Sequence, residues 1–136
     1  MGDAYTANLI PNFLPENTDQ ESIDAGVDMF KLADECGEDT QIVAAGYSQG
    51  SAVISGAVQA LDDSLRDKVK GVALFGFTRN LQDDGQIPGY PEDQTKVYCA
   101  VGDLVCSGTL IITPAHLTYG SDAGDAADFL AGTVDA

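Results

Sequence analysis

The chain has 136 residues, 44% of them hydrophobic, which is enough for one domain with a modest core, and we treat residues 1–136 as a single domain. Six residues are Lys or Arg and 22 are Asp or Glu, giving a formal net charge of −16. Nucleic acids and anionic membranes are bound through clustered basic side chains, so this balance argues against a nucleic-acid partner, disfavours an anionic membrane surface and favours a neutral substrate. No apolar run approaches the ~20 residues that span a bilayer, so no membrane span is expected.

The N-terminal part of the chain predicts a loop followed by a helix. Proline and asparagine punctuate residues 1–17, with an edge strand expected at 5–7. Thr18 and Glu21 have the spacing of a capping box, which predicts a helix from Thr18 to about Cys36. Apolar side chains at i, i+4 and i+7 form one buried stripe, made of Ile23, Val27 and Phe30.

A G-x-S-x-G sequence stands between a predicted strand and a predicted helix. A strand at 41–45 precedes Gly46-Tyr47-Ser48-Gln49-Gly50, and a helix at 51–61 follows it. A serine at the tip of such a sharp turn is lifted clear of the sheet, and the flanking glycines avoid collisions with the strand and the helix. The pattern is that of the nucleophile elbow of α/β-hydrolases, with a plain glycine-rich turn as the alternative.

The remaining elements alternate between apolar runs and turns. The apolar run at 71–77 and the segment at 96–101 have the length and composition of buried parallel strands. We also expect a short helical restart at 65–69, turn-rich loops at 83–91 and 102–120, and a closing helix at 122–134. This order predicts an α/β fold, a three-layer α/β/α sandwich with a parallel sheet, whose ligands bind beyond the carboxyl ends of the strands.

A catalytic serine needs a base, and the chain has one histidine, His116. A lone loop histidine can equally be a surface residue. The order serine, acid, histidine restricts the third member to residues 49–115. Asp103 follows the 96–101 strand directly, whereas four other acids lie in polar loops and look solvated: Asp83, Asp84, Glu92 and Asp93. Ser48, Asp103 and His116 are therefore the candidate triad, and an ordinary turn aspartate is the alternative for Asp103.

The three cysteines are an odd number. Cys99 and Cys106 are close enough in sequence to close a small loop, which would hold Asp103 in place, and Cys36 is left over. A disulfide implies an oxidising, extracellular compartment, and an unpaired cysteine there suggests a partner outside this chain.

Three segments taken together resemble the cutinases, secreted serine esterases of fungi. They are Gly-Tyr-Ser-Gln-Gly at 46–50, Cys-Ala-Val-Gly-Asp-Leu-Val-Cys at 99–106 and His-Leu-Thr-Tyr-Gly at 116–120, and the segments 74–80 and 87–91 are similar too. The resemblance covers nearly the whole chain. It implies a cutinase-like α/β-hydrolase with Ser48 as nucleophile, Asp103 as orienting acid and His116 as base.

The resemblance also implies the rest of the site. It implies a Cys99–Cys106 disulfide and an oxyanion donor at the backbone of Gln49. Substrate contacts carried over from the family are Leu9, Asn12, Tyr47, Leu110, Ile112 and Leu117. Cutinases cleave cutin polyester and short-chain esters without a cofactor or metal, so none is expected here. Acetylated xylan is the alternative substrate.

The chain departs from the family pattern at its N-terminus. Family members carry a further segment before the position that matches Gly2, with two strands, a serine that completes the oxyanion hole and the cysteine that pairs with the match to Cys36. We therefore expect an N-terminally truncated domain, with a shorter reorganised protein as the alternative. Cys36 should be a free thiol or form an intermolecular disulfide, and unpaired strand edges should favour self-association. A weakly active or non-catalytic fragment, or binding domain, is the alternative function.

Overall fold

The computed structural model describes Tyr5, Asn8 and residues 10–134. Its α-helices are α1 (Gln20–Asp34), α2 (Gln49–Ala60), α3 (Asp63–Arg66) and α4 (Ala123–Thr133), and its strands are β1 (Ile42–Tyr47), β2 (Val69–Phe75) and β3 (Thr95–Tyr98). Short 3-10 helices are η1 (Ile10–Phe13), η2 (Glu92–Gln94), η3 (Leu104–Ser107), η4 (Pro114–Leu117) and η5 (Tyr119–Asp122). The edge strand predicted at 5–7 cannot be judged, because Thr6 and Ala7 lie outside the described residues.

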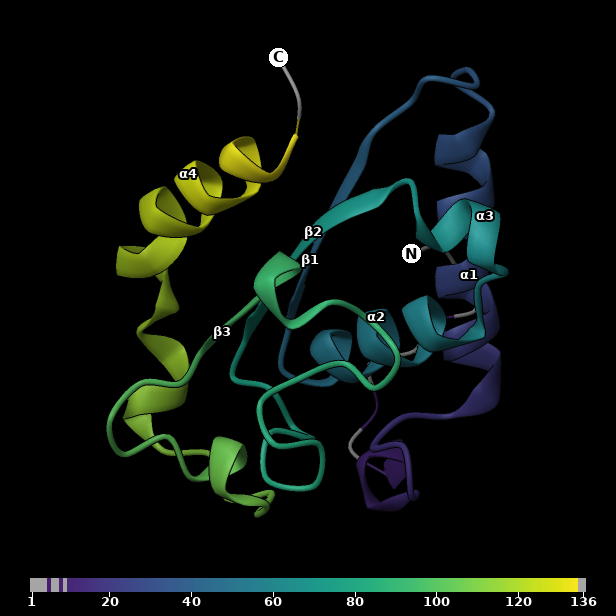
Figure 1. Cartoon of the computed structure of the whole chain (residues 1–136). Helices are drawn as coiled ribbons and strands as arrows, with labels where there is room; N and C mark the ends of the chain where they lie inside the picture. Colours follow the sequence, from purple (N-terminus) through teal and green to yellow (C-terminus); the bar gives the residue numbers. More distant parts are fainter. Residues whose placement is uncertain (1–4, 6–7, 9, 135–136) are drawn as a thin grey trace.

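The described strands form one parallel sheet in the order β1-β2-β3. β2 is central, with Tyr47 of β1 opposite Phe75 and Val97 of β3 opposite Leu74. Helix α2 packs on β1 and α4 packs on β2, and Figure 1 shows α4 on one side of the sheet and α1, α2 and α3 on the other. The predicted three-layer α/β architecture is confirmed.

The core lies between the sheet and the α1–α2 layer. In α1, Ile23 and Phe30 are each 5% exposed and Val27 is partly buried, so the predicted apolar stripe faces the core. The middle of β2 is closed on both faces, since Val72, Ala73 and Leu74 have no exposed surface. Such full burial is typical of a strand in the centre of a parallel sheet.

The start of α1 differs from the prediction. The N-cap is Asp19, whose Oδ1 accepts the Ser22 backbone N–H at 2.7 Å, so the capping box at Thr18 and Glu21 is wrong. An aspartate is a better cap than a threonine, because its charge also favours the positive helix end. Thr18 is instead buried, at 2% exposure.

Several predicted boundaries move by a few residues. Helix α2 begins at Gln49, directly after Ser48, two residues earlier than predicted. The helical restart is α3, and Val69 already belongs to β2. The loop predicted at 102–120 contains η3, η4 and the start of η5, which hydrophobic periodicity does not signal because a single 3-10 turn is too short to show it.

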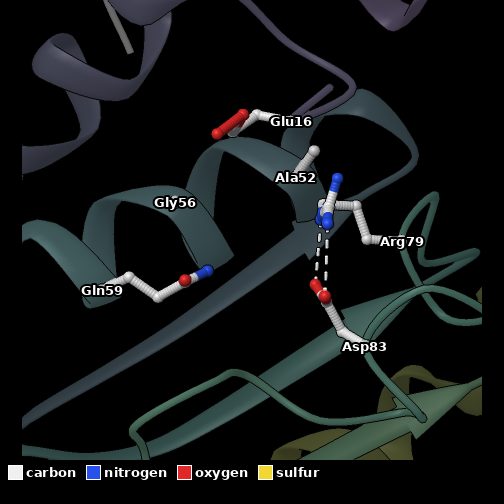
Figure 2. A pocket seen from close by; sticks show the side chains of 6 residues that line it. All are labelled: Glu16, Ala52, Gly56, Gln59, Arg79 and Asp83. Atoms are coloured by element: carbon white, nitrogen blue, oxygen red, sulfur yellow. Dashed lines mark hydrogen bonds and ion pairs between the residues drawn. The ribbon is translucent and has the colours of Figure 1, made fainter. Parts of the chain in front are cut away.

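Asp83 is a further correction, because it is not solvated. Its side chain is 9% exposed and accepts Arg79 Nε at 2.9 Å and Nη2 at 3.2 Å. Figure 2 shows this fork at one end of a small pocket beside α2 that Glu16, Ala52, Gly56 and Gln59 also line. Arg79 additionally donates to the Pro15 carbonyl, so the pair joins the loop before α1 to the turn after β2.

Candidate active site

The site is built on the turn between β1 and α2. Ser48 has φ 56° and ψ −124°, a strained conformation for a residue with a side chain, and its N–H donates to the Phe75 carbonyl at 2.9 Å. A Cβ on Gly46 would lie 2.7 Å from the Gly50 carbonyl oxygen, so Gly46 must be glycine. Gly50 differs from the expectation, because a Cβ there meets no described atom within 4 Å beyond its own neighbours.

Three predicted residues are brought into one hydrogen-bonded line. His116 Nε2 lies 2.9 Å from Ser48 Oγ, and His116 Nδ1 lies 2.8 Å from Asp103 Oδ2. They come from the end of β1, the residue before η3 and the middle of η4. His116 is 2% exposed and Asp103 is 4% exposed. The arrangement can move a proton from the serine to the imidazole and hold the imidazole by the carboxylate.

Asp103 is surrounded by donors. Its Oδ1 accepts the Val105 N–H at 3.1 Å, while Oδ2 accepts from both His116 Nδ1 and the Tyr119 hydroxyl. Burial raises the pKa of Asp103, but the hydrogen bonds from Tyr119, His116 and Val105 outweigh it, so the pKa is lowered. The carboxylate is therefore ionised near neutral pH.

Two residues that support this line were missed by the sequence reasoning. Gly76, at φ 59°, follows β2, and a Cβ there would lie 2.7 Å from His116 Cε1 and 2.9 Å from Nδ1. The Tyr119 hydroxyl donates a hydrogen bond to Asp103 Oδ2. The only signal for Gly76 was a glycine at the end of an apolar run, and Tyr119 lay inside the third motif without a role.

A disulfide joins Cys99 and Cys106, and Cys36 is a free, exposed cysteine. Cys106 Sγ lies 3.8 Å from Asp103 Oδ2 and 3.8 Å from the Tyr119 hydroxyl. The cross-link therefore spans the turn from which Asp103 projects and packs directly against its carboxylate.

Gln49 is the first residue of α2, where backbone N–H groups have no acceptor within the helix. The positive end of the helix dipole lies there too, beside Ser48. This position suits a donor for developing negative charge. Across the part of the chain that the structure describes, no group of three or more His, Cys, Asp or Glu side chains is arranged to hold a metal ion.

Of the six predicted substrate contacts, two line the same cleft. Tyr47 and Leu117 line one cleft of about 310 Å³, together with Tyr119 and Gly120. Leu110 is half-buried and Ile112 is exposed, and neither lines that cleft. Asn12 is buried, with its Nδ2 donating to the Asn8 carbonyl at 3.1 Å, while Leu9 lies outside the described residues.

Tyr47 has a second contact that the sequence did not predict. Its hydroxyl donates to the His116 carbonyl at 2.8 Å, and its ring stacks on the imidazole at 5.1 Å between centroids. Tyr47 is 46% exposed, so its ring contacts the histidine on one side and lines the cleft on the other.

Known proteins resemble this chain over nearly its whole length. The family model described as Cutinase matches residues 1–134. Cutinase 3 of Emericella nidulans is 74% identical over 134 residues, and the cutinase of Fusarium solani subsp. cucurbitae is 47% identical over 131. These matches cover 98% and 96% of this chain but 60% and 57% of the relatives, so the chain spans about 60% of their length.

Solved structures agree on the fold. The Trichoderma reesei cutinase, in complex with a C11Y4 phosphonate inhibitor, superposes with a TM-score of 0.76 at 33% identity, over 86% of this chain and 52% of that one. A cutinase-like protein from Cryptococcus sp. matches with a TM-score of 0.64 at 23% identity, over 81% and 66% of the two chains, which supports the fold alone. The chain belongs to the cutinase family.

Proposed function

We propose that this chain is a carboxylic ester hydrolase of the cutinase type that works through an acyl-enzyme on Ser48. The observation that carries the proposal is the line from Ser48 Oγ through His116 to Asp103, at 2.9 and 2.8 Å. The three side chains meet at the carboxyl end of a parallel sheet, where substrates of this fold class bind.

Acylation begins when Ser48 Oγ attacks the ester carbonyl carbon and gives its proton to His116 Nε2. Asp103 holds Nδ1–H, so Nε2 is the free acceptor, and its charge stabilises the imidazolium that forms. The carbonyl oxygen becomes an oxyanion that the Gln49 N–H stabilises. The intermediate collapses, the carbon–oxygen bond to the alcohol breaks, and His116 returns the proton to that alcohol.

Deacylation repeats these steps with water. His116 takes a proton from the water as it attacks the acyl carbon, and Ser48 Oγ leaves and regains a proton from His116. Because the base must be unprotonated at both stages, activity should rise with pH as this single histidine loses its proton.

The surroundings of Ser48 support an apolar ester substrate. At the same end of the sheet, Figure 1 shows η1 and the loops that carry η3 and η4. Several large apolar residues on these segments are at least 59% exposed, among them Ile10, Phe13, Ile111, Ile112 and Leu117. Exposed apolar patches around a polar site mark contact with an apolar partner. Cutin polyester and short-chain esters are the proposed substrates, and the disulfide supports a secreted, extracellular enzyme.

Rapid mixing with p-nitrophenyl butyrate tests the proposal. An acyl-enzyme predicts a burst of p-nitrophenol with an amplitude near one per chain, and Ser48→Ala should abolish it while Ser121→Ala, at an exposed serine, should not. A folded parent without burst or turnover would leave a non-catalytic binding domain. Parallel assays on an emulsified aliphatic polyester and on acetylated xylan distinguish the two substrate classes.

We also infer that the chain self-associates through the edge of β1. Val43 on this strand is 42% exposed, and an apolar groove of about 240 Å³ runs between the strand and α1, lined by Met29, Phe30, Ala33, Val43 and Ile54 among others. An exposed strand edge offers unpaired backbone groups to another chain. Sedimentation at several chain concentrations would detect this association.

A further inference from the structure

Tyr119 lies where it can act on the histidine without touching the reacting atoms. It is 6% exposed, and its hydroxyl donates to Asp103 Oδ2, the same oxygen that accepts His116 Nδ1–H. The hydroxyl also accepts the backbone N–H of Ala100 at 3.0 Å. Because Ala100 occupies a lone pair of the hydroxyl, the phenolic proton is free to point at the carboxylate. The result is a directed chain of donors that ends on the acid of the proposed triad.

The ring of Tyr119 is fixed by its neighbours. It makes edge contacts with Tyr47 at 6.1 Å, with Phe75 at 6.0 Å and with the His116 imidazole at 6.2 Å between centroids. Because the ring is already immobilised, the hydroxyl loses little conformational entropy when it forms its hydrogen bond. Burial and the bond to Asp103 both raise the pKa of Tyr119, so it stays a proton donor across the pH range in which an esterase works.

We propose that Tyr119 is a positioning residue that tunes His116 through Asp103, by neutralising part of the carboxylate's charge. The inference rests on the proposed function for its effect on rate, but the contact itself is independent of substrate. A carboxylate that accepts a hydrogen bond from a hydroxyl shares its negative charge between that hydroxyl and the imidazolium. It therefore stabilises the imidazolium less strongly. Without the hydroxyl, His116 should keep its proton to higher pH.

The titratable side chains in contact with the imidazole are few. Asp103 faces Nδ1 from the start of η3, Tyr119 faces the ring from η5, and Tyr47 stacks on it from β1. The Tyr47 hydroxyl donates to the backbone carbonyl of His116 rather than to its ring. Asp103 is thus the charged group among these contacts. Among the described residues, the N–H of His116 and the O–H of Tyr119 are the side-chain donors to Asp103 Oδ2.

The experiment compares Tyr119→Phe with the parent by NMR. The chain has a single histidine, so the titration of its Cε1–H signal needs no assignment. We expect the midpoint to move up by about 0.5 to 1 pH unit, which is a modest share of a hydrogen bond to a charged group. Tyr98→Phe is the matched control, because Tyr98 donates to the exposed Asp125 at 2.7 Å on the surface and should leave the midpoint unchanged.

The kinetic readout is separate. The acid limb of kcat/KM should shift by the same amount in Tyr119→Phe, so that the parent's advantage is several-fold larger at pH 6 than at pH 9, with KM unchanged. If the parent proves inactive but the NMR midpoint moves, the proposed function fails and the role of Tyr119 stands. If the midpoint of the folded variant equals the parent's, Tyr119 only packs and the proposal is wrong.

A second variant covers the case in which Tyr119→Phe does not fold. Site-specific incorporation of 3-fluorotyrosine at position 119 keeps the ring and the hydroxyl and makes the hydroxyl a stronger donor. The midpoint of His116 should then move down, opposite to the effect of removing the hydroxyl. An unchanged or raised midpoint in the fluorinated protein would overturn the proposal.

Discussion

The two edges of β1 differ sharply. One edge pairs with β2 and leads to the proposed catalytic residues, and the other is open. On the side of β2, the strand is paired along its length, Ser48 N–H reaches the Phe75 carbonyl, and His116 and Asp103 arrive from segments beyond β3. On the other side, the described residues include no neighbouring strand, and Val43 stands exposed above an apolar groove. Changes on the first side should therefore alter the reaction, and changes on the second should alter folding or association.

Among the residues that support Ser48, the largest effect is expected from Asp103→Asn. The amide donates to His116 Nδ1 and favours the wrong tautomer, so kcat should fall by about 10⁴ with the fold retained. Initial rates and circular dichroism measure both properties. Asp128→Asn, at an exposed position of α4, should change neither. A fall of less than tenfold would remove Asp103 from the mechanism.

Gly76→Ala should be the next most severe substitution. The new methyl group would meet His116 Cε1 at 2.7 Å, and φ 59° is strained for any residue with a side chain. Displacing the base by about 1 Å should lower kcat by about 10². Gly124→Ala in α4 is the matched control, since its Cβ meets nothing within 4 Å among the described atoms. Equal rates for the two variants would show that Gly76 does not hold the histidine.

The pH dependence of stability tests the lowered pKa of Asp103. A group whose pKa is lowered in the folded state stabilises the protein above its unfolded pKa, about 3.9, and loses that contribution as pH falls through the folded value. Denaturant unfolding of the parent and of Asp103→Asn should therefore show a difference at pH 6 that shrinks below about pH 4. A constant difference down to pH 2.5 would contradict the assigned cause.

The smallest effect on catalysis should come from the open edge. Val43→Lys places a charge on the edge of β1, which disfavours pairing with another chain. We expect weaker self-association, by about tenfold or more in the dissociation constant, with the same kcat per chain. Leu32→Lys adds the same charge at an exposed position of α1 away from the groove lining and serves as control. Identical association of both variants and the parent would dismiss the edge as an interface.

Much of the fold was predictable because it is encoded by local patterns. The strand-like segments at 41–45, 71–77 and 96–101 located the three described strands within a few residues, and the stripe on α1 gave its buried face. The elbow followed from one five-residue motif. The cap of α1 was misplaced by one residue, because Thr18 and Asp19 are both suitable cap residues and only the backbone chooses between them.

The supporting residues of the site were not predictable in the same way. Tyr119 and Gly76 matter because of what lies opposite them in space, 16 and 40 residues away from their partners Asp103 and His116. The polar loop around Asp83 predicts a solvated side chain, yet Arg79, four residues earlier, forms a two-pronged ion pair with it. Side-chain partners across a loop leave no periodic signal in the sequence.

The proposed reaction depends first on Ser48 being a nucleophile activated through His116. The Trichoderma reesei cutinase was solved with a phosphonate inhibitor, which suggests the most direct measurement. The chain should be incubated with a p-nitrophenyl alkylphosphonate and digested for peptide mass spectrometry, with Ser48→Ala in parallel. We expect one phosphonyl group per chain, bound to Ser48 with release of one p-nitrophenolate, and none in the variant. A folded parent that stays unlabelled, or that carries the group on another residue, would contradict it.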